Sequence, residues 1–275
     1  MKFKAAYYGE RGSYSEQAAT QHFGQKAAMK SCKFVSEVLE SVGRDSQFGV
    51  VPIENSIEGA VTQTYDLLFN SKLVIVGEEI VKISHCLMAL RGVKLSGIRK
   101  VYSHPQALGQ CRKYIESHNL DTIPFYDTAG SAKMLKESGM RDSAVIASLR
   151  AASIYEMDVL ARDIQSNKCN YTRFLVIAKK PLPGPADKTS IAFGTKNRSG
   201  ALFKALQSFA NNSVNLLYIQ SRPIPDKPWE YNFYIDCLGS AHERKVKKAL
   251  SDLRSVSDYV KVLGSYKRAR FEIRA

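Results

Sequence analysis

The sequence has few cysteines, and none of them stands at metal-ligand spacing. There are five, an odd number, and no two form a C-x-x-C or similar pattern. We therefore expect reduced thiols in a cytoplasmic protein, most of them in the core, and no cysteine-based metal centre. The five are Cys32, Cys86, Cys111, Cys169 and Cys237.

Long apolar runs are also missing. No stretch approaches the ~20 consecutive apolar residues that a membrane-spanning helix needs. The first residues, MKFKAAYYGERGSY, lack the apolar core of a secretory signal peptide. With 44% hydrophobic and 24% charged residues among 275, the composition predicts a globular protein that does not enter a membrane and has one large core or two domains.

Acidic residues are outnumbered by basic ones. The chain has 40 Lys and Arg against 26 Asp and Glu, a formal net charge of +14. Such an excess suits nucleic acid, an anionic surface or an acidic small molecule. The sequence contains neither a helix-turn-helix signature nor a basic patch interleaved with aromatic residues, so we expect no nucleic-acid partner. An acidic ligand and a plain solvated basic surface both remain open.

A proline-rich segment divides the chain. The stretch KKPLPGPADK, residues 179–188, has three prolines and a glycine in ten positions. Such a composition is typical of a linker. We expect one domain over 1–180, a linker over 181–187 and a second domain over 188–275.

Before the linker, short apolar strands lead repeatedly into helices that open with a hydroxyl or amide residue. This alternation predicts an α/β fold with a largely parallel sheet. Three pairs fit the spacing of a helix-capping box: Ser13 with Glu16, Asn55 with Glu58, and Ser103 with Gln106.

After the linker, the pattern changes to two helices among four strands. The order βαββαβ predicts a ferredoxin-like sandwich. The strands are expected over 189–195, 214–222, 231–239 and 259–268, and the helices over 199–212 and 242–256.

Polar residues gather where the strands of the first domain end. Ligands of open α/β sheets bind at the carboxyl ends of the strands, where helix starts offer free N–H groups and positive dipole ends. Several such turns could cradle carboxylates, although each residue taken singly is explained as a helix cap. Arg173, in a later strand, fits either a bidentate carboxylate partner or an ordinary edge-strand arginine.

Several longer motifs occur in a family's order along the whole chain. They are GERGSYSEQAA (9–19), GVVPIENSIEGAV (49–61), SHPQALGQC (103–111), NYTRF (170–174), GAL (200–202) and NLLYIQSRP (215–223). On these motifs the sequence closely resembles the prephenate dehydratases. The resemblance implies decarboxylating dehydration of prephenate to phenylpyruvate in phenylalanine biosynthesis, with arogenate as the preferred substrate of some members. It implies no metal and no organic cofactor.

The resemblance also implies an architecture. The catalytic domain, 1–180, is similar to a two-lobed periplasmic-binding-protein fold with the active site in the cleft. Lobe one would comprise 1–78 and 165–180, and lobe two 79–164. The second domain, 188–275, would be an ACT regulatory domain.

The family's catalytic threonine falls on Thr172, which we expect to relay a proton or to hydrogen-bond the leaving hydroxyl. Glu54 and His104 are the strongly titratable groups in these motifs, and either could hold a proton. A structural role remains open for His104 and for Phe174. We interpret His85 as structural. The expected substrate-binding residues are Asn55, Ser56, Ser103, Arg173 and Phe174, with Ser13, Ser15 and Thr128 as secondary contacts.

A regulatory site is implied as well. ACT domains pair and bind amino acids where they pair, so we expect a phenylalanine effector and a homodimer or homotetramer. A helix cap and a strand entry explain the same residues without a ligand. The family's ESRP is QSRP here, with Gln220 in place of Glu, and Ser166 replaces a usual acidic residue. The expected effector contacts are Gly200, Ala201, Leu202, Asn215 and Leu216.

Two other functions compete with the enzyme. A two-lobed sensor of an aromatic amino acid would share the fold and the anion cradles, but it has no need of Thr172 and Arg173 beside an acid. A nucleic-acid-binding regulator would explain the net charge alone. The sequence leaves open the choice of prephenate or arogenate, inhibition by phenylalanine, the oligomeric state and the proton donor.

Overall fold

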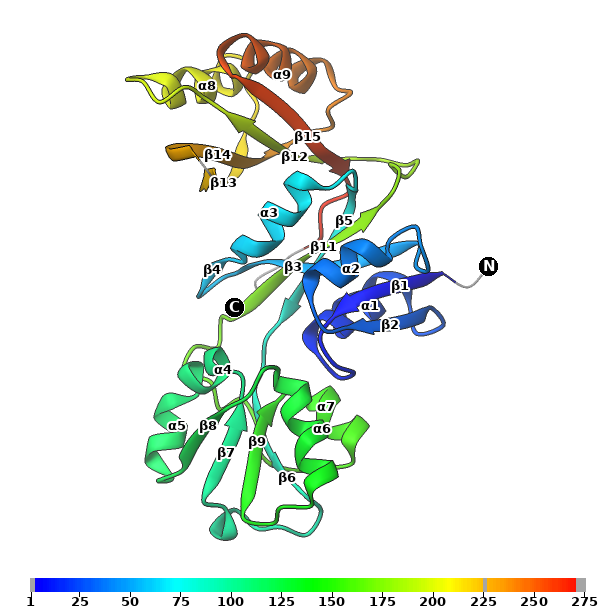
Figure 1. Cartoon of the computed structure of the whole chain (residues 1–275), viewed down its shortest axis with the longest axis vertical. Coiled ribbons are helices and arrows are strands. Elements are labelled where there is room, and N and C mark those ends of the chain that lie inside the picture. The colour runs from blue at the N-terminus through cyan, green and yellow to red at the C-terminus, as the bar shows by residue number, and fades with distance from the viewer. Residues whose placement is uncertain (1–2, 225–226, 271–275) are drawn as a thin grey trace.

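The computed structural model describes residues 3–224 and 227–270 and arranges them as three units along one long axis (Figure 1). Each unit has its own β-sheet. The chain runs from the first unit, lobe one, into the second, lobe two, returns to lobe one, and then enters the C-terminal domain. None of the helices in the described part of the chain is long and apolar enough to cross a membrane.

Lobe one is built on a sheet in the order β2-β1-β3-β11-β5, with β4 paired to β3. Its first three strands are parallel, and β11 is antiparallel to both of its neighbours. The strands are β1 (Lys4–Tyr8), β2 (Ala28–Cys32), β3 (Phe48–Asn55), β4 (Gly59–Ala60), β5 (Val74–Lys82) and β11 (Tyr171–Ala178). The helices are α1 (Tyr14–Phe23), α2 (Val35–Ser41) and α3 (Thr62–Asn70).

Lobe two is built on a sheet in the order β10-β6-β9-β7-β8. Strand β7 is parallel to β8 and β9, while β6 is antiparallel to β9 and β10. The strands are β6 (Cys86–Ala89), β7 (Lys100–Ser103), β8 (Asp121–Pro124), β9 (Ser143–Ala147) and β10 (Asp158–Ala161). The helices are η1 (Leu95–Gly97), α4 (Pro105–Gln110), α5 (Arg112–Ser117), α6 (Thr128–Ser138) and α7 (Leu149–Tyr155).

Two crossings join the lobes, one after β5 and one before β11. Lys82 still pairs with Tyr171, so β5 belongs to lobe one over its full length. Lobe one therefore extends beyond the expected boundary at residue 78. The difference arises because β5 and β11 are paired along their whole length, which carries both strands to the rim of the cleft.

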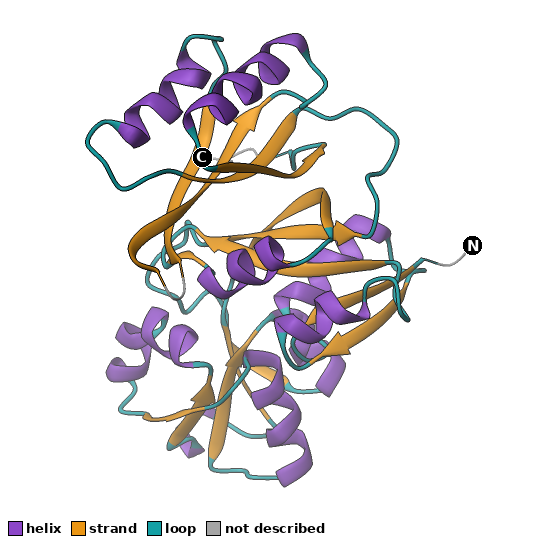
Figure 2. Ribbon diagram, turned by 45° about the horizontal axis from the view of Figure 1, so that its top comes forward, coloured by secondary structure: helices purple, strands orange, loops and turns teal. Residues whose placement is uncertain are grey.

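The C-terminal domain has the expected βαββαβ order, with its four strands antiparallel in the order β13-β14-β12-β15. Helices α8 and α9 lie together over the outer face of the sheet (Figure 2). The elements are β12 (Lys188–Gly194), α8 (Ala201–Ala210), β13 (Leu216–Ile224), β14 (Lys227–Leu238), α9 (Arg244–Val256) and β15 (Tyr259–Tyr266).

The inner face of this sheet packs directly on lobe one. Ala192 and Tyr234 of the C-terminal domain share one hydrophobic core with Val51 and Tyr65 of lobe one. The domain therefore has two different faces: its helices cover the outer face of the sheet, and lobe one covers the inner face. Its inner face is thereby held against the sheet that carries β11.

The cysteines are placed as their spacing predicts. All five are free, four of them are buried, and Cys169 is exposed.

Candidate active site

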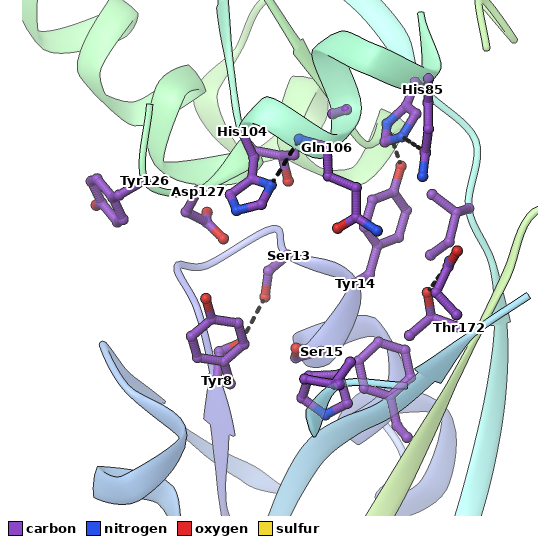
Figure 3. A pocket seen from close by; sticks show the side chains of 18 residues that line it. Tyr8, Ser13, Tyr14, Ser15, His85, His104, Gln106, Tyr126, Asp127 and Thr172 are labelled. Carbon is purple, nitrogen blue, oxygen red and sulfur yellow. Dashed lines mark hydrogen bonds between the residues drawn. The ribbon is translucent and has the colours of Figure 1, made fainter. Parts of the chain in front are cut away.

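A cavity of about 300 Å³ lies between the two lobes. Figure 3 shows Tyr8 and Ser13 of lobe one across from His104 and Asp127 of lobe two. The cavity is lined by Tyr8, Ser13, Tyr14, Ser15, Pro52, Asn55, Val61, Ile83, His85, His104, Gln106, Ala107, Gln110, Tyr126, Asp127, Thr128, Thr172 and Phe174.

Strand alternation decides which residues of the two central motifs reach the cavity. Successive side chains of a strand point to opposite faces of the sheet. Thr172 of β11 is paired in register with Asn55 of β3, and both line the cavity. Arg173 is paired with Glu54, and neither lines it. The expectation that Arg173 and Glu54 act in the cleft is thus corrected, because both point to the other face.

The hydroxyl of Thr172 is oriented by an amide. Asn55 Nδ2 donates to Thr172 Oγ1 at 2.9 Å. Asn55 Oδ1 accepts the backbone N–H groups of Ile57 and Glu58, each at 3.0 Å. Because backbone N–H groups can only donate, they fix which end of the amide faces Thr172. Thr172 Oγ1 therefore accepts from Asn55, and its own hydrogen is left to donate elsewhere.

These bonds also correct the expected role of Asn55 as a helix cap. Its Oδ1 closes the turn between β3 and β4, whereas the next helix, α3, begins at Thr62. The capping-box spacing was present, but the following residues form a hairpin. The Asn55 oxygen thus accepts hydrogen bonds within the turn, and the Asn55 nitrogen donates to Thr172.

A chain of side-chain contacts continues from Asn55 into lobe two. Asn55 Nδ2 donates to Asn170 Oδ1 at 2.8 Å, and Asn170 Nδ2 donates to Gln110 Oε1 at 2.7 Å. His85 Nε2 lies 3.0 Å from the same oxygen, so this nitrogen carries the hydrogen. Burial lowers the pKa of His85. We therefore regard His85 as a neutral donor that anchors Gln110 at the cleft.

The expected serines divide between the cavity and its surroundings. Ser13 and Ser15 line it, and Ser13 caps α1 by accepting the N–H of Glu16 at 3.3 Å. Ser103 is fully buried and donates to a backbone carbonyl of β9 at 2.6 Å, outside the cavity. Ser56 also lies outside, where it donates to the carbonyl of the crossing segment at 3.1 Å. The expected ligand contacts of Ser56 and Ser103 are corrected accordingly.

His104, not Ser103, caps helix α4. Its Nδ1 accepts the N–H of Gln106 at 3.3 Å, and burial lowers its pKa. A neutral imidazole that accepts at Nδ1 carries its hydrogen on Nε2. His104 can therefore donate a hydrogen bond in the cavity at neutral pH without adding a positive charge.

Asp127 is the acidic residue of the cavity, and the sequence reasoning missed it. It caps α6 by accepting the N–H of Gly130 at 2.7 Å. Burial, with the nearby charge of Glu10, raises its pKa to about 6. A Cβ at Gly9 would lie 3.2 Å from Asp127 Oδ2 and 3.3 Å from Ser13 Oγ, so the Asp127 and Ser13 side chains meet at one glycine.

The cavity has no fixed positive charge among the residues that line it. Of the 18 described residues around it, none is Lys or Arg. The described part of the chain also holds no group of three or more His, Cys, Asp or Glu side chains suited to a metal ion. An anionic ligand here would rely on N–H groups, hydroxyls and the starts of α1 and α6.

The family is decided by comparison with known sequences. The prephenate dehydratase profile matches residues 5–182. The chain belongs to the prephenate dehydratase family. A bifunctional chorismate mutase/prephenate dehydratase of Aquifex aeolicus is 41% identical over 98% of this chain and 74% of its own length. Arogenate dehydratase 2 of Petunia hybrida is 38% identical over 96% of this chain and 72% of its own length.

Solved structures of similar fold include two with a TM-score of 0.88. One is a prephenate dehydratase of Arthrobacter aurescens in complex with L-Phe, 35% identical over 96% of this chain and 90% of that one. The other, described as GqqA, a novel type of quorum quenching acylase, is 30% identical over 96% of this chain and 98% of that one.

The residues expected to bind an effector in this dehydratase-family chain lie in two places. Ala201 and Leu202 line a small pocket of about 110 Å³ near Trp229, and Gly200 precedes them with φ of 75° at the start of α8. Asn215 and Leu216 stand at the entry of β13 and do not line this pocket. Leu202 and Leu216, one from each group, nevertheless pack against the same hydrophobic core of the domain.

Asp127→Asn is expected to make the protein more stable at alkaline pH. The folded-state pKa of about 6 lies above the ordinary 3.8, so the folded state loses stability as pH rises between these values. Above pH 6, the neutral variant should gain up to about 3 kcal/mol, and asparagine can still cap α6.

Denaturant unfolding at pH 8 and pH 4 measures this difference, with the exposed Asp121→Asn as control. The gain should shrink towards pH 4 and be absent in the control. Equal stability of wild type and Asp127→Asn at pH 8 would contradict a buried, costly carboxylate.

Proposed function

We propose that the protein is a prephenate dehydratase that converts prephenate to phenylpyruvate, a step of phenylalanine biosynthesis, in the cytoplasm. The observation that carries the proposal is the Thr172 hydroxyl, oriented by Asn55 to donate from the wall of the interlobe cavity. It sits in a chain of the matching family. No metal or organic cofactor enters the proposed reaction.

The reaction breaks two bonds of the substrate ring. The carbon–oxygen bond to the ring hydroxyl breaks, and this group needs a proton to leave as water. The carbon–carbon bond to the ring carboxylate breaks, carbon dioxide leaves, and the electron pair completes the aromatic ring. The protein must therefore place a proton at one oxygen and hold the substrate so that both bonds align.

Thr172 supplies the hydrogen bond to the departing hydroxyl. A threonine hydroxyl is too weak an acid to protonate a leaving group alone, so it needs a proton source behind it or beside the substrate. Asp127 lines the same cavity, and its pKa of about 6 leaves a minor fraction protonated near neutral pH, far more than an ordinary aspartate would have. We assign the donor role to Asp127 and not to Glu54, whose carboxylate is bonded to Arg173.

The carboxylates of the substrate are proposed to bind at the helix starts. Ser13 and Ser15 present hydroxyls at the start of α1, and Thr128 does so at the start of α6. His104 adds a neutral N–H donor. These groups would bind the carboxylates, the role that the sequence suggested for Arg173. Phe174 lines the apolar side of the cavity.

Arogenate is the second candidate substrate, and one observation favours it. Arogenate carries an ammonium group where prephenate has a keto group, so its net charge is less negative. A cavity lined by Asp127 and by no Lys or Arg among the described residues suits an ammonium better than a second full negative charge. The relative from Petunia hybrida bears this activity in its name.

The acylase chemistry described for one structural neighbour fits this cavity less well. An acylase nucleophile needs a base to take its proton. At Thr172 Oγ1 the structure places an amide donor, which makes the oxygen less nucleophilic. A non-catalytic sensor likewise has no need of that oriented hydroxyl.

The C-terminal domain is proposed to bind phenylalanine where two copies of it pair. Exposed Leu217 and Ile219 on the edge strand β13, with exposed Phe203 and Trp229, provide an apolar surface for a second copy. We propose that Ala201 of one copy and Asn215 of the other contribute to a single phenylalanine site in the pair. This supports a homodimer or homotetramer as the working unit.

The activity is tested by giving the purified protein prephenate and arogenate separately. We expect phenylpyruvate from prephenate, and Thr172→Ala should lower kcat by about 100-fold or more because it removes the donor at the leaving oxygen. Thr172→Ser keeps a hydroxyl and should keep most of the rate. Added phenylalanine should change the rate if the paired C-terminal domains regulate it.

Faster turnover of arogenate than of prephenate by the wild type would select the second candidate. If neither substrate is converted while phenylalanine still binds, the protein is a sensor and the enzyme proposal is refuted.

Asn55→Asp is expected to lower kcat by about 100-fold, with thermal unfolding followed in parallel to show that the variant is folded. Aspartate keeps the acceptor for the turn 56–58 but cannot donate to Thr172, so the threonine would donate to the carboxylate and not to the substrate. Steady-state kinetics with Ser56→Ala as control, whose hydroxyl lies outside the cavity, measures the effect. An Asn55→Asp variant with wild-type kcat would refute the oriented-hydroxyl mechanism.

A further inference from the structure

The face of β11 that points away from the cavity is bonded to the C-terminal domain. Arg173 Nη1 donates to Asp236 Oδ2 of β14 at 2.7 Å. Its Nη2 and Nε donate to Glu54 Oε2 at 2.9 and 3.1 Å. The guanidinium also lies over the ring of Tyr218, 5.2 Å from the centroid. One side chain thus joins the central strands of lobe one to the C-terminal sheet.

The partners on the C-terminal side are themselves fixed. Ser190 Oγ donates to the second oxygen of Asp236 at 2.5 Å. Lys188 Nζ lies 3.3 Å from Asp236 and donates to Glu78 of β5 at 2.8 Å. We call Glu54, Glu78, Arg173, Lys188 and Asp236 the interdomain cluster. Four of its five members are buried, Glu54 being the exception.

The cluster is sensitive to the loss of any one member. Burial by itself raises the pKa of Asp236, but Arg173 and Lys188 hold it below its ordinary value. Buried pairs of this kind add little to stability compared with apolar packing, yet removing one partner leaves an uncompensated charge. Such a cluster therefore fixes one geometry more than it strengthens the fold.

That geometry bears directly on Thr172. Arg173 is its neighbour in β11, and the register of β11 against β3 shifts just after Arg173. A strand residue whose side chain is held on one face sets the direction in which its neighbour points on the other. We propose that Arg173 is a positioning residue through which Asp236 of the C-terminal domain holds the Thr172 hydroxyl in place. This inference rests on the proposed dehydratase function.

A second ion pair between lobe one and the C-terminal domain provides the control. Arg222 Nη2 of β13 donates to Asp66 Oδ2 of α3 at 2.7 Å. This pair, like Arg173 and Asp236, joins an arginine to an aspartate across the interface between lobe one and the C-terminal domain. It does not include β11. The pair is more exposed than Arg173 and Asp236, so Asp66→Asn loosens the interface without leaving a buried charge and without any change at β11.

The experiment compares Asp236→Asn with Asp66→Asn in the full-length protein, using whichever substrate the wild type converts. Asp236→Asn should lower kcat by about tenfold or more and change KM by no more than about threefold, because Thr172 contacts the leaving group while the carboxylates bind elsewhere. Asp66→Asn should leave both constants within about twofold. Equal effects of the two variants, or a fully active Asp236→Asn, would overturn the proposal.

A second variant covers the case in which Asp236→Asn does not fold. Arg173→Lys keeps the positive charge but not the fork that reaches Asp236 and Glu54 together. It should lower kcat while thermal unfolding stays near that of the wild type, and wild-type kcat in this variant would overturn the proposal. An inactive wild type would instead refute the dehydratase function, so the two failures are distinguishable.

Discussion

Strand β11 is paired on both sides, with β3 and β5. Its side chains alternate between two faces of the sheet, one towards the cavity and one towards the C-terminal domain. Thr172 and Phe174 face the cavity between the lobes. Arg173, between them, faces the C-terminal domain and bonds to Asp236. Because neighbouring strand residues cannot turn independently, one backbone segment holds both the Thr172 side chain in the cavity and the Arg173 side chain at the C-terminal domain.

A second constraint acts on the cavity side. The turn after β3 uses the oxygen of Asn55, so its nitrogen must face Thr172. The orientation of the Thr172 hydroxyl is thereby set by two backbone N–H groups. With no Lys or Arg among the described residues around the cavity, anion binding is left to helix starts and neutral donors. Burial, with the nearby charge of Glu10, keeps the pKa of Asp127 raised. Both features suit a site that must hold a proton as well as a carboxylate.

Much of the architecture could be predicted from the sequence. The βαββαβ order after the linker followed from periodicity, and the motifs pointed to Thr172, Asn55, His104 and Ser13, which the fold brings to one cavity. The family resemblance supplied the two lobes, which local patterns could not.

The errors have a common physical origin. A motif such as TRF or PIENS states which residues are adjacent, but the face of each depends on strand pairing, and this turned Arg173 and Glu54 away from the cavity. Asn55 and Glu58 have the spacing of a helix cap, yet a hairpin follows because β4 pairs with β3. Asp127 was missed because an aspartate before a helix looks like an ordinary cap. Its burial against Glu10 comes from the other lobe, which no local pattern reveals.

The two faces of β11 can be seen directly in a crystal structure with a non-reactive dicarboxylate analogue of the substrate. We predict that the ligand carboxylates contact the starts of α1 and α6, that Thr172 Oγ1 lies within hydrogen-bond distance of the ring oxygen, and that Arg173 stays bonded to Asp236 and Glu54. An Arg173 side chain turned into the cavity and paired with a ligand carboxylate would contradict the claim that Arg173 serves the C-terminal domain and not the substrate.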